Sequence, residues 1–315
     1  MADEFETIAK LFAPLATHPG ARGLADDAAV LGNLVLTTDA IVEGVHFLPD
    51  DPIETVAKKA LRVNLSDIAA KGAKPVGVLV ALMWPHRRNG AEIAAFARGL
   101  GEDLRAFGAP LLGGDTTSTP GPLAVSVTVI GEALGRVPAR ADARVGEDVW
   151  VTGTIGDGML GLQHLGGSIA NELSEEDAAY LIGRYRTPAP RLTFASAIAT
   201  HASASMDVSD GLAQDAAKIA AASGLAIDLD LAAVPLSAPA RGWVAEGGAI
   251  EALMAGGDDY ELLFTAPPEA RAAIETDGRA AGLQVTRIGR TLAGAGVTAD
   301  GAPIRVSGYR HTLGR

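Results

Sequence analysis

The sequence predicts an α/β protein built from two mixed α/β domains. Its 315 residues exceed the length at which one hydrophobic core usually stops growing. Apolar runs typical of strands, such as VGVLVALMW, alternate with helical patterns along the whole chain. The turn-rich, charged stretch GRVPARADARVGED interrupts this alternation near the middle. We therefore expect an N-terminal domain at 1–137 and a C-terminal domain at 138–315.

The first half combines short and long strands with helices. Residues 1–12 predict a short helix, and residues 25–38 predict two strands joined by the Gly-Asn turn of AVLGNLVL. A long helix is expected from Ile53 to about Ala73, because its apolar residues are spaced for one buried stripe: Ala57, Ala60, Leu61, Leu65 and Ile68. The remaining elements are, in order, a buried strand (VGVLVALMW), a helix (89–107), a short strand (PLLGGD) and a long strand (LAVSVTVIGEAL).

The second half repeats this mixture after the strand DVWVTG. There follow, in order, helices (156–166, 174–186 and 190–200), a strand ending at Val208, a helix (210–223), a strand (LAIDLDL), a helix (245–254), a strand (YELLFTA), a helix (267–282), a strand (LQVTRIG) and one or two small terminal strands. No internal repeat or long linker is evident.

Composition restricts the location and the partners of the chain. No apolar run reaches the length of a membrane span, and MADEFETIAKLF lacks the character of a secretory leader. The chain contains no cysteine, which excludes disulfides, thiolate metal sites and cysteine nucleophiles. We therefore expect a cytoplasmic protein. The 26 basic and 38 acidic residues give a net charge of −12, which argues against nucleic acid or an anionic membrane as a partner.

An acidic motif recurs where predicted strands end. In MDVSDGLAQD, Asp207 and Asp210 flank Ser209, and carboxylates this close repel each other unless a cation lies between them. Related groupings occur at Asp26 with Asp27, Thr37 with Thr38 and Asp39, Asn64 with Asp67, Asp115 with Thr116, and Asp258 with Asp259. Carboxylate and hydroxyl oxygens are ligands that Mg²⁺ prefers. Each motif alone is equally compatible with a solvated turn. Their recurrence in both halves predicts a polynuclear metal site shared by the domains.

The common phosphate-binding motifs do not account for the chain. The P-loop pattern is absent, because no Gly-Lys pair occurs. A G-x-G-x-x-G pattern does occur at Gly156, Gly158 and Gly161, after a predicted strand. A dinucleotide site would require a second strand ending in an acid about 20 residues later. A loop and a helix follow instead, so we expect a glycine turn that packs a helix closely on a strand.

A family resemblance extends over nearly the whole chain. Ten stretches carry it, in order: EFETIAKLF, ADDAAV, LTTDAIVEGVHF, KALRVNLSDIAAKGAKP, LLGGDTT, VWVTGTIGD, RTPAPR, MDVSDGL, GGDDYELLFT and SGYRH. The chain resembles the thiamine-monophosphate kinase family, of the aminoimidazole ribonucleotide synthetase-like superfamily. The resemblance implies an N-terminal ATP- and Mg-binding domain that pairs its sheet across a homodimer, and a C-terminal α/β domain that completes the active site. It also implies phosphoryl transfer from ATP to thiamine monophosphate with several Mg²⁺ ions.

The same resemblance assigns roles to individual residues. The Mg²⁺ ligands would be Asp27, Thr37, Thr38, Asp39, Asp67, Asp115, Asp207 and Asp210. ATP would contact Gly114, Asp115, Arg140 and Ser209, and thiamine monophosphate would contact His46, Asp258 and Tyr309. The family usually has Glu where this chain has Asp258, which is one methylene shorter.

The implied reaction needs positioning and charge neutralisation rather than a covalent intermediate. The acceptor is a phosphate monoester with a second pKa of about 6, so its oxygen is anionic near neutral pH and requires no general base. We therefore expect no catalytic side chain beyond metal-held positioning, and Asp210 is the strongest single candidate. The neighbouring acids are expected to support the site from behind or to cap helices: Asp26, Asp157, Asp215 and Asp259.

Other interpretations fit parts of the pattern. Another ATP-dependent ligase or cyclase of the superfamily would share the metal-binding acids but not the substrate residues. A non-catalytic protein could bind Ca²⁺ in acidic loops, although the helix–loop–helix calcium spacing is missing. Among single residues, His46 could bond backbone in a turn, Arg140 could be a solvated loop residue, and Tyr309 could anchor the chain terminus.

Overall fold

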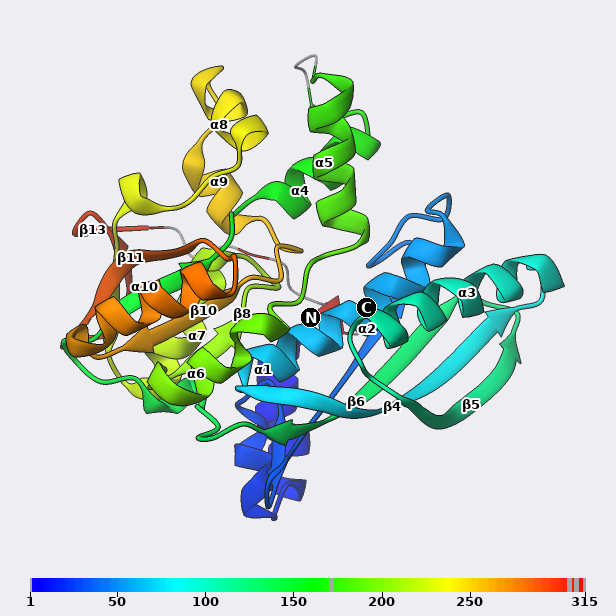
Figure 1. Cartoon of the computed structure of the whole chain (residues 1–315), viewed down its shortest axis with the longest axis horizontal. Helices are drawn as coiled ribbons and strands as arrows, with labels where there is room; N and C mark the ends of the chain where they lie inside the picture. Colours follow the sequence, from blue (N-terminus) through cyan, green and yellow to red (C-terminus); the bar gives the residue numbers. More distant parts are fainter. Residues whose placement is uncertain (1, 170–172, 305–307, 309–311, 314–315) are drawn as a thin grey trace.

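Two β-sheets, each with its own helices, make up the protein. The computed structural model describes residues 2–169, 173–304, 308 and 312–313 (Figure 1). The N-terminal half contains a five-stranded sheet of order β2-β3-β6-β4-β5, and the C-terminal half a seven-stranded sheet of order β13-β12-β9-β11-β7-β10-β8. The prediction of two mixed α/β domains is confirmed. Within the described ranges, no helix is both long enough and apolar enough to cross a membrane.

The five-stranded sheet is mainly antiparallel. Its strands are β2 (Ala29–Leu31), β3 (Leu34–Val42), β4 (Ala73–Pro85), β5 (Leu111–Thr119) and β6 (Ala124–Ala133). Only the β4–β5 pair is parallel, and it sets Ala81 opposite Asp115. The alternating residues of β6 place valines on the buried face, where they meet helix α2. Strand β5 lies at the edge of the sheet and is exposed along most of its length.

Helix α2 (Ile53–Ala70) is the element that links the two halves. The apolar stripe expected from the sequence is buried, and so are polar residues on other faces, because the helix lies between the first sheet and elements of the second half (Figure 1). Helix α3 (Gly90–Ala106) packs beside α2 and begins with a capping box formed by Asn89 and Glu92. The polar residues Asn64, Ser66 and Asp67 of α2 therefore face protein rather than bulk water, whereas Glu54 and Lys58 remain partly exposed.

The seven-stranded sheet is formed by strands from the whole second half. They are β7 (Asp148–Thr152), β8 (Ser205–Asp207), β9 (Ala226–Leu229), β10 (Leu262–Ala266), β11 (Val285–Leu292), β12 (Gly296–Ala299) and β13 (Ala302–Pro303). The helices are α4 (Asp157–Leu165), α5 (Glu175–Arg186), α6 (Ala195–His201), α7 (Leu212–Ser223), α8 (Ala238–Ala245), α9 (Ile250–Ala255) and α10 (Arg271–Ala280). A two-residue strand, β1 (Ala2–Asp3), pairs with β14 (Thr312–Leu313) and brings the two chain ends together (Figure 1).

Two expected helices differ from the structure. The N-terminal helix is broken into α1 (Glu4–Thr7), a π-helical turn (Ile8–Phe12) and a 3₁₀ turn (Ala13–Leu15). No residue in these turns is buried, so no packing holds a regular helix there. The helix expected at 245–254 is wrong: α8 and α9 flank a turn in which Gly247 has φ of 102°, and the Ser237 cap of α8 was overlooked.

Candidate active site between the two domains

A cavity of about 950 Å³ opens between the two halves. Its walls come from the N-terminal segment, the loop before β2, strand β3, helix α2, the end of β8, helix α7 and the segment before β10. Nine of the residues assigned from the sequence line it: Asp27, Asp39, His46, Asp67, Arg140, Asp207, Ser209, Asp210 and Asp258. The structure therefore brings together acids that are up to 231 residues apart in the chain.

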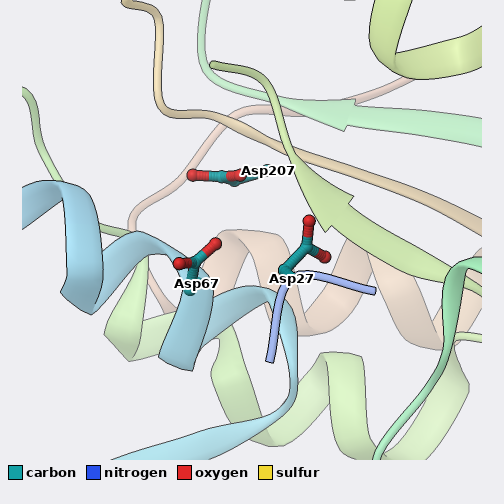
Figure 2. A group of neighbouring side chains, drawn as sticks. All are labelled: Asp27, Asp67 and Asp207. Carbon is teal, nitrogen blue, oxygen red and sulfur yellow. The ribbon is translucent and has the colours of Figure 1, made fainter. Parts of the chain in front are cut away.

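Three carboxylates meet at the centre of this site. Asp27 lies just before β2, Asp67 lies on α2, and Asp207 is the last residue of β8. One oxygen from each carboxylate lies within 4.8 Å of the other two, and Figure 2 shows the three groups facing one another. We call these residues the central acids. Oxygen ligands at this separation are suited to a hard divalent cation.

The central acids and their neighbour Asp39 repel one another. Burial, followed by the charge of Asp27, raises the pKa of Asp207 to about 8. Burial, and then Asp207, Asp39 and Asp27, raise the pKa of Asp67 well above its usual value. Asp39 is exposed at the cavity wall, and desolvation by the surrounding cavity, followed by the charges of Asp27 and Asp210, raises its pKa to about 6. A cation among these groups would relieve the repulsion.

Asp27 differs because basic residues surround it. Burial alone would raise its pKa, but Arg140 and Lys71 outweigh that effect and lower the pKa to about 2. Arg140 forms an ion pair with Asp27, and the fully buried Lys71 forms ion pairs with both Asp26 and Asp27. Lys71 also donates to the Ser205 carbonyl at 2.6 Å and so joins the two halves. The sequence interpretation missed Lys71, because nothing in AAKGAKP signals a buried lysine.

The three consecutive polar residues of β3 have separate environments. The Thr37 hydroxyl donates to the Asp67 carboxylate at 2.6 Å, behind the cavity wall. The Asp39 amide donates to the Asn64 side chain at 2.8 Å, which ties β3 to α2. The Thr38 hydroxyl instead donates to the Val127 carbonyl, because successive strand residues point to opposite faces. Thr38 is not among the described residues that line the cavity.

The loop after β8 consists of Ser209, Asp210 and Gly211, which we call the SDG loop, and side chains of α7 hold it in place. The Asp215 carboxylate accepts the amides of Ser209 and Asp210 at 3.0 and 3.1 Å. Lys218 bridges Asp210 and Asp215 at 2.6 and 2.7 Å. Gly211 has φ of 116°, which favours glycine at this turn. Asp215 thus supports the loop as expected, whereas Lys218 was not anticipated.

The segment before β10 presents Asp258 to the cavity. Asp258 has φ of 70°, and its carboxylate lies 3.2 Å from the Lys59 ammonium. The next residue, Asp259, accepts the amides of Gly156 and Gly158 and so caps α4, in line with its expected supporting role. A side chain at Gly158 would collide with the Asp258 carbonyl, so this glycine allows α4 to pack closely, but against the segment before β10 and not on a strand as expected.

His46 was expected either to bond backbone in a turn or to contact the substrate, and its position allows both. Its Nδ1 atom accepts the Val42 amide at 3.0 Å, as a turn histidine would, and the residue also lines the cavity.

Gly114 and Asp115 do not reach this cavity. They lie on the exposed edge strand β5, and they are not among the described residues that line the site. Tyr309 lies outside the described residues.

Comparisons with known proteins identify both halves. Residues 25–133 match the family "AIR synthase related protein, N-terminal domain", and residues 144–301 match "AIR synthase related protein, C-terminal domain". A thiamine-monophosphate kinase of Caulobacter vibrioides is 45% identical over 308 residues, covering 94% of this chain and 86% of the relative.

Solved structures agree with this relationship. Thiamine monophosphate kinase from Aquifex aeolicus has a TM-score of 0.84 and 33% identity, covering 96% of this chain and 97% of that one. AaThiL complexed with AMPPCP and TMP has a TM-score of 0.87 and 33% identity, covering 98% and 97% of the two chains.

Proposed function

The chain belongs to the thiamine-monophosphate kinase family, within the AIR synthase related proteins, and from this premise we propose how its interdomain cavity works. The enzyme transfers the γ-phosphoryl group of ATP to thiamine monophosphate and forms thiamine diphosphate. One observation carries the assignment of the site: three carboxylates from both halves converge within 4.8 Å in a cavity of about 950 Å³.

The donor set of the cavity fits Mg²⁺. The central acids offer hard oxygen ligands without a thiol or imidazole among them, and Asp39 and Asp210 line the same cavity. When bound, Mg²⁺ supplies charge neutralisation between the two phosphate groups that react. The raised pKa values of Asp67 and Asp207 support this role, because these carboxylates lack a cationic partner of their own among the described residues. Thr37 acts here through its bond to Asp67.

Different residues around the central acids are assigned to the two substrates. We assign Arg140 and Ser209 to the nucleotide, because a guanidinium suits two phosphate oxygens and the SDG loop is held rigid by Asp215. We assign His46 and Asp258 to thiamine monophosphate. The acceptor phosphate is already anionic near pH 7, since its second pKa is about 6, so in-line attack needs alignment rather than a base.

The assembly around the site is also part of the proposal. Strand β5 is an exposed edge that carries Leu111 and Leu112 at 51% and 60% exposure, and pairing with a second copy would cover it. In a homodimer, Gly114 and Asp115 would bind ATP and Mg²⁺ in the neighbourhood of the second copy, since they do not line the cavity of their own chain. Light scattering should give twice the mass of the chain; the mass of one chain would contradict the dimer.

We further propose a boundary between the domains at 137/138 and a cytoplasmic location, where ATP is available.

A turnover assay tests the function. Purified protein with ATP, Mg²⁺ and thiamine monophosphate should form equal amounts of ADP and thiamine diphosphate. EDTA should abolish the reaction, and excess Mg²⁺ should restore it. ATP consumption without thiamine diphosphate would contradict the proposal.

The variant Asp210→Asn tests the site. We expect kcat to fall by about 10²-fold or more, as when a group that stabilises transferred charge is removed. Thermal unfolding should change little, because Asp210 lies at the cavity and is 23% exposed. A variant that unfolds, while its folded fraction turns over normally, would contradict the assignment.

A further inference from the structure

Lys59 is a buried lysine that reaches from α2 to the substrate side of the cavity. Its side chain is 2% exposed. The Nζ atom donates to the His46 carbonyl at 2.9 Å and to the Asp258 carboxylate at 3.2 Å, and it lies 3.9 Å from the centre of the Tyr185 ring. A buried ammonium requires partners of this kind. Lys59 therefore joins the N-terminal domain to two segments of the C-terminal domain.

The backbone around Asp258 is already fixed without Lys59. The amides of Asp258 and Tyr260 donate to the carbonyls of Ser209 and Val208 at 3.0 and 2.8 Å. Both residues have positive φ, at 70° and 51°. These bonds fix the backbone of this segment. They do not fix the orientation of the Asp258 side chain, which depends on the contacts of its carboxylate.

Lys59 supplies the charged contact of that carboxylate. The ion pair crosses from α2 to the segment before β10, and the same ammonium holds the turn that contains His46. Asp258 and His46 are the two residues assigned above to thiamine monophosphate. A single ammonium thus contacts both the His46 turn and the Asp258 carboxylate and links them directly.

We propose that Lys59 is a positioning residue for thiamine monophosphate, which orients Asp258 and the His46 turn for the thiamine part of the substrate. This inference rests on the proposed function. Thiamine carries a cationic thiazolium and an aminopyrimidine, and a carboxylate held in one orientation suits either group. Lys59 bonds neither Arg140 nor Ser209 among the described residues, and Asp258 holds Ser209 through its backbone amide rather than through the carboxylate that Lys59 contacts, so we expect the effect to fall on one substrate.

Stability alone does not explain this lysine. A buried ion pair is often no more stabilising than apolar side chains of similar volume. Methionine would fill the same channel against Tyr185, and Asp258, which is 25% exposed, would remain hydrated. Lys59→Met therefore removes the charge while keeping most of the packing.

Lys58 provides a matched control on the same helix. It pairs with Glu102 at 2.7 Å on the outer surface, where the two side chains are 23% and 55% exposed. Lys58→Met removes the same charge without touching the cavity. We expect its KM values for both substrates to equal those of the unaltered protein.

Steady-state kinetics on the full chain tests the inference. For Lys59→Met we expect the KM for thiamine monophosphate to rise about tenfold, while the KM for ATP stays within about twofold. Asp258→Asn should raise the same KM, and the double variant should raise it no further than the larger single effect, because both changes break one pair. Lys59→Arg should recover part of the loss.

Three outcomes would overturn the inference. In Lys59→Met, the KM for thiamine monophosphate could stay unchanged, or the KM values for both substrates could rise equally. In the double variant, the KM for thiamine monophosphate could rise by the product of the two single effects. If Lys59→Met fails to fold, Asp258→Asn and Lys59→Arg still test the pair. No turnover by the unaltered protein would overturn the proposed function itself, which distinguishes the two failures.

Discussion

The buried acids of the cavity and the buried acids behind it have opposite surroundings. Behind the cavity, Glu261 is paired with Arg184, Arg191 and Thr152, with contacts of 2.7, 2.6 and 2.7 Å. Asp157 accepts hydroxyls from Ser237, Tyr180 and Thr154, and Asp259 accepts amides. We call Asp157, Asp259 and Glu261 the support cluster. In the cavity, Asp67 and Asp207 instead face other acids, whereas Asp27 is paired with Lys71 and Arg140.

This difference separates structural carboxylates from those that we propose to bind Mg²⁺. Burial also raises the pKa of Asp259, so a raised pKa by itself does not identify a binding site. The partners do: donors surround each member of the support cluster, whereas Asp67 and Asp207 face other acids. Three predictions test the contrast.

The largest effect is expected at a central acid. Asp207→Asn should lower kcat by about 10³-fold, because it removes one of three converging ligands. The metal-free variant should unfold at the same or a higher denaturant concentration, since a neutral amide avoids the burial of charge and the repulsion from Asp27 that raise the pKa of Asp207 to about 8. Kinetics and urea unfolding in EDTA measure the two effects. A strong loss of stability would place Asp207 with the support cluster.

The reverse result is expected in the support cluster. Glu261→Gln should lower the free energy of unfolding by about 3 kcal/mol, because it leaves Arg184 and Arg191 without their shared carboxylate. Urea unfolding measures the change, and the exposed pair of Arg98 and Glu54 offers a control, where Glu54→Gln should cost about 0.5 kcal/mol or less. Equal losses of unfolding free energy in Glu261→Gln and Glu54→Gln would show that the support cluster is no more stabilising than an exposed ion pair.

The smallest effect is expected from pH. The folded pKa values of Asp39 and Asp207, about 6 and about 8, lie above the unfolded value of about 4, so their contribution to stability is present below pH 4 and is lost as pH rises through 8. Solvent screens the exposed Asp39, so the shifts convert to less than their full value, and without metal the protein should lose about 1–2 kcal/mol of stability between pH 5 and pH 8.

Mg²⁺ should reverse this trend, because it binds the deprotonated carboxylates. Thermal unfolding with EDTA or Mg²⁺ at pH 5 and pH 8 tests the prediction. The stabilisation by Mg²⁺ should be larger at pH 8, and Asp207→Asn should reduce the difference. An equal benefit at both pH values would argue against cation binding by these acids.

Local patterns predicted most elements, but not their breaks. The apolar stripe of α2 and the valine alternation of β6 each specify an element through contacts a few residues apart. The N-terminal segment is broken because none of its residues is buried to hold a regular helix, and the turn at Gly247 interrupts the helix expected at 245–254.

The site was predictable to the level of its acids. Each Asp could be recognised from a strand end or a helix face, and the cavity collects seven of the aspartates singled out from the sequence. The buried lysines Lys59 and Lys71 could not, because a lysine in a helical sequence ordinarily points to solvent. Their partners lie 13 to 199 residues away.

The sequence by itself determined the two-domain composition, most of the helices and strands, and which carboxylates were candidates for metal, since these depend on short-range periodicity and residue chemistry. Only the tertiary structure decided which carboxylates face each other and which face donors. That decision depends on how α2 packs between the two halves, and no local spacing along the chain records which distant side chains such packing brings within a few ångströms.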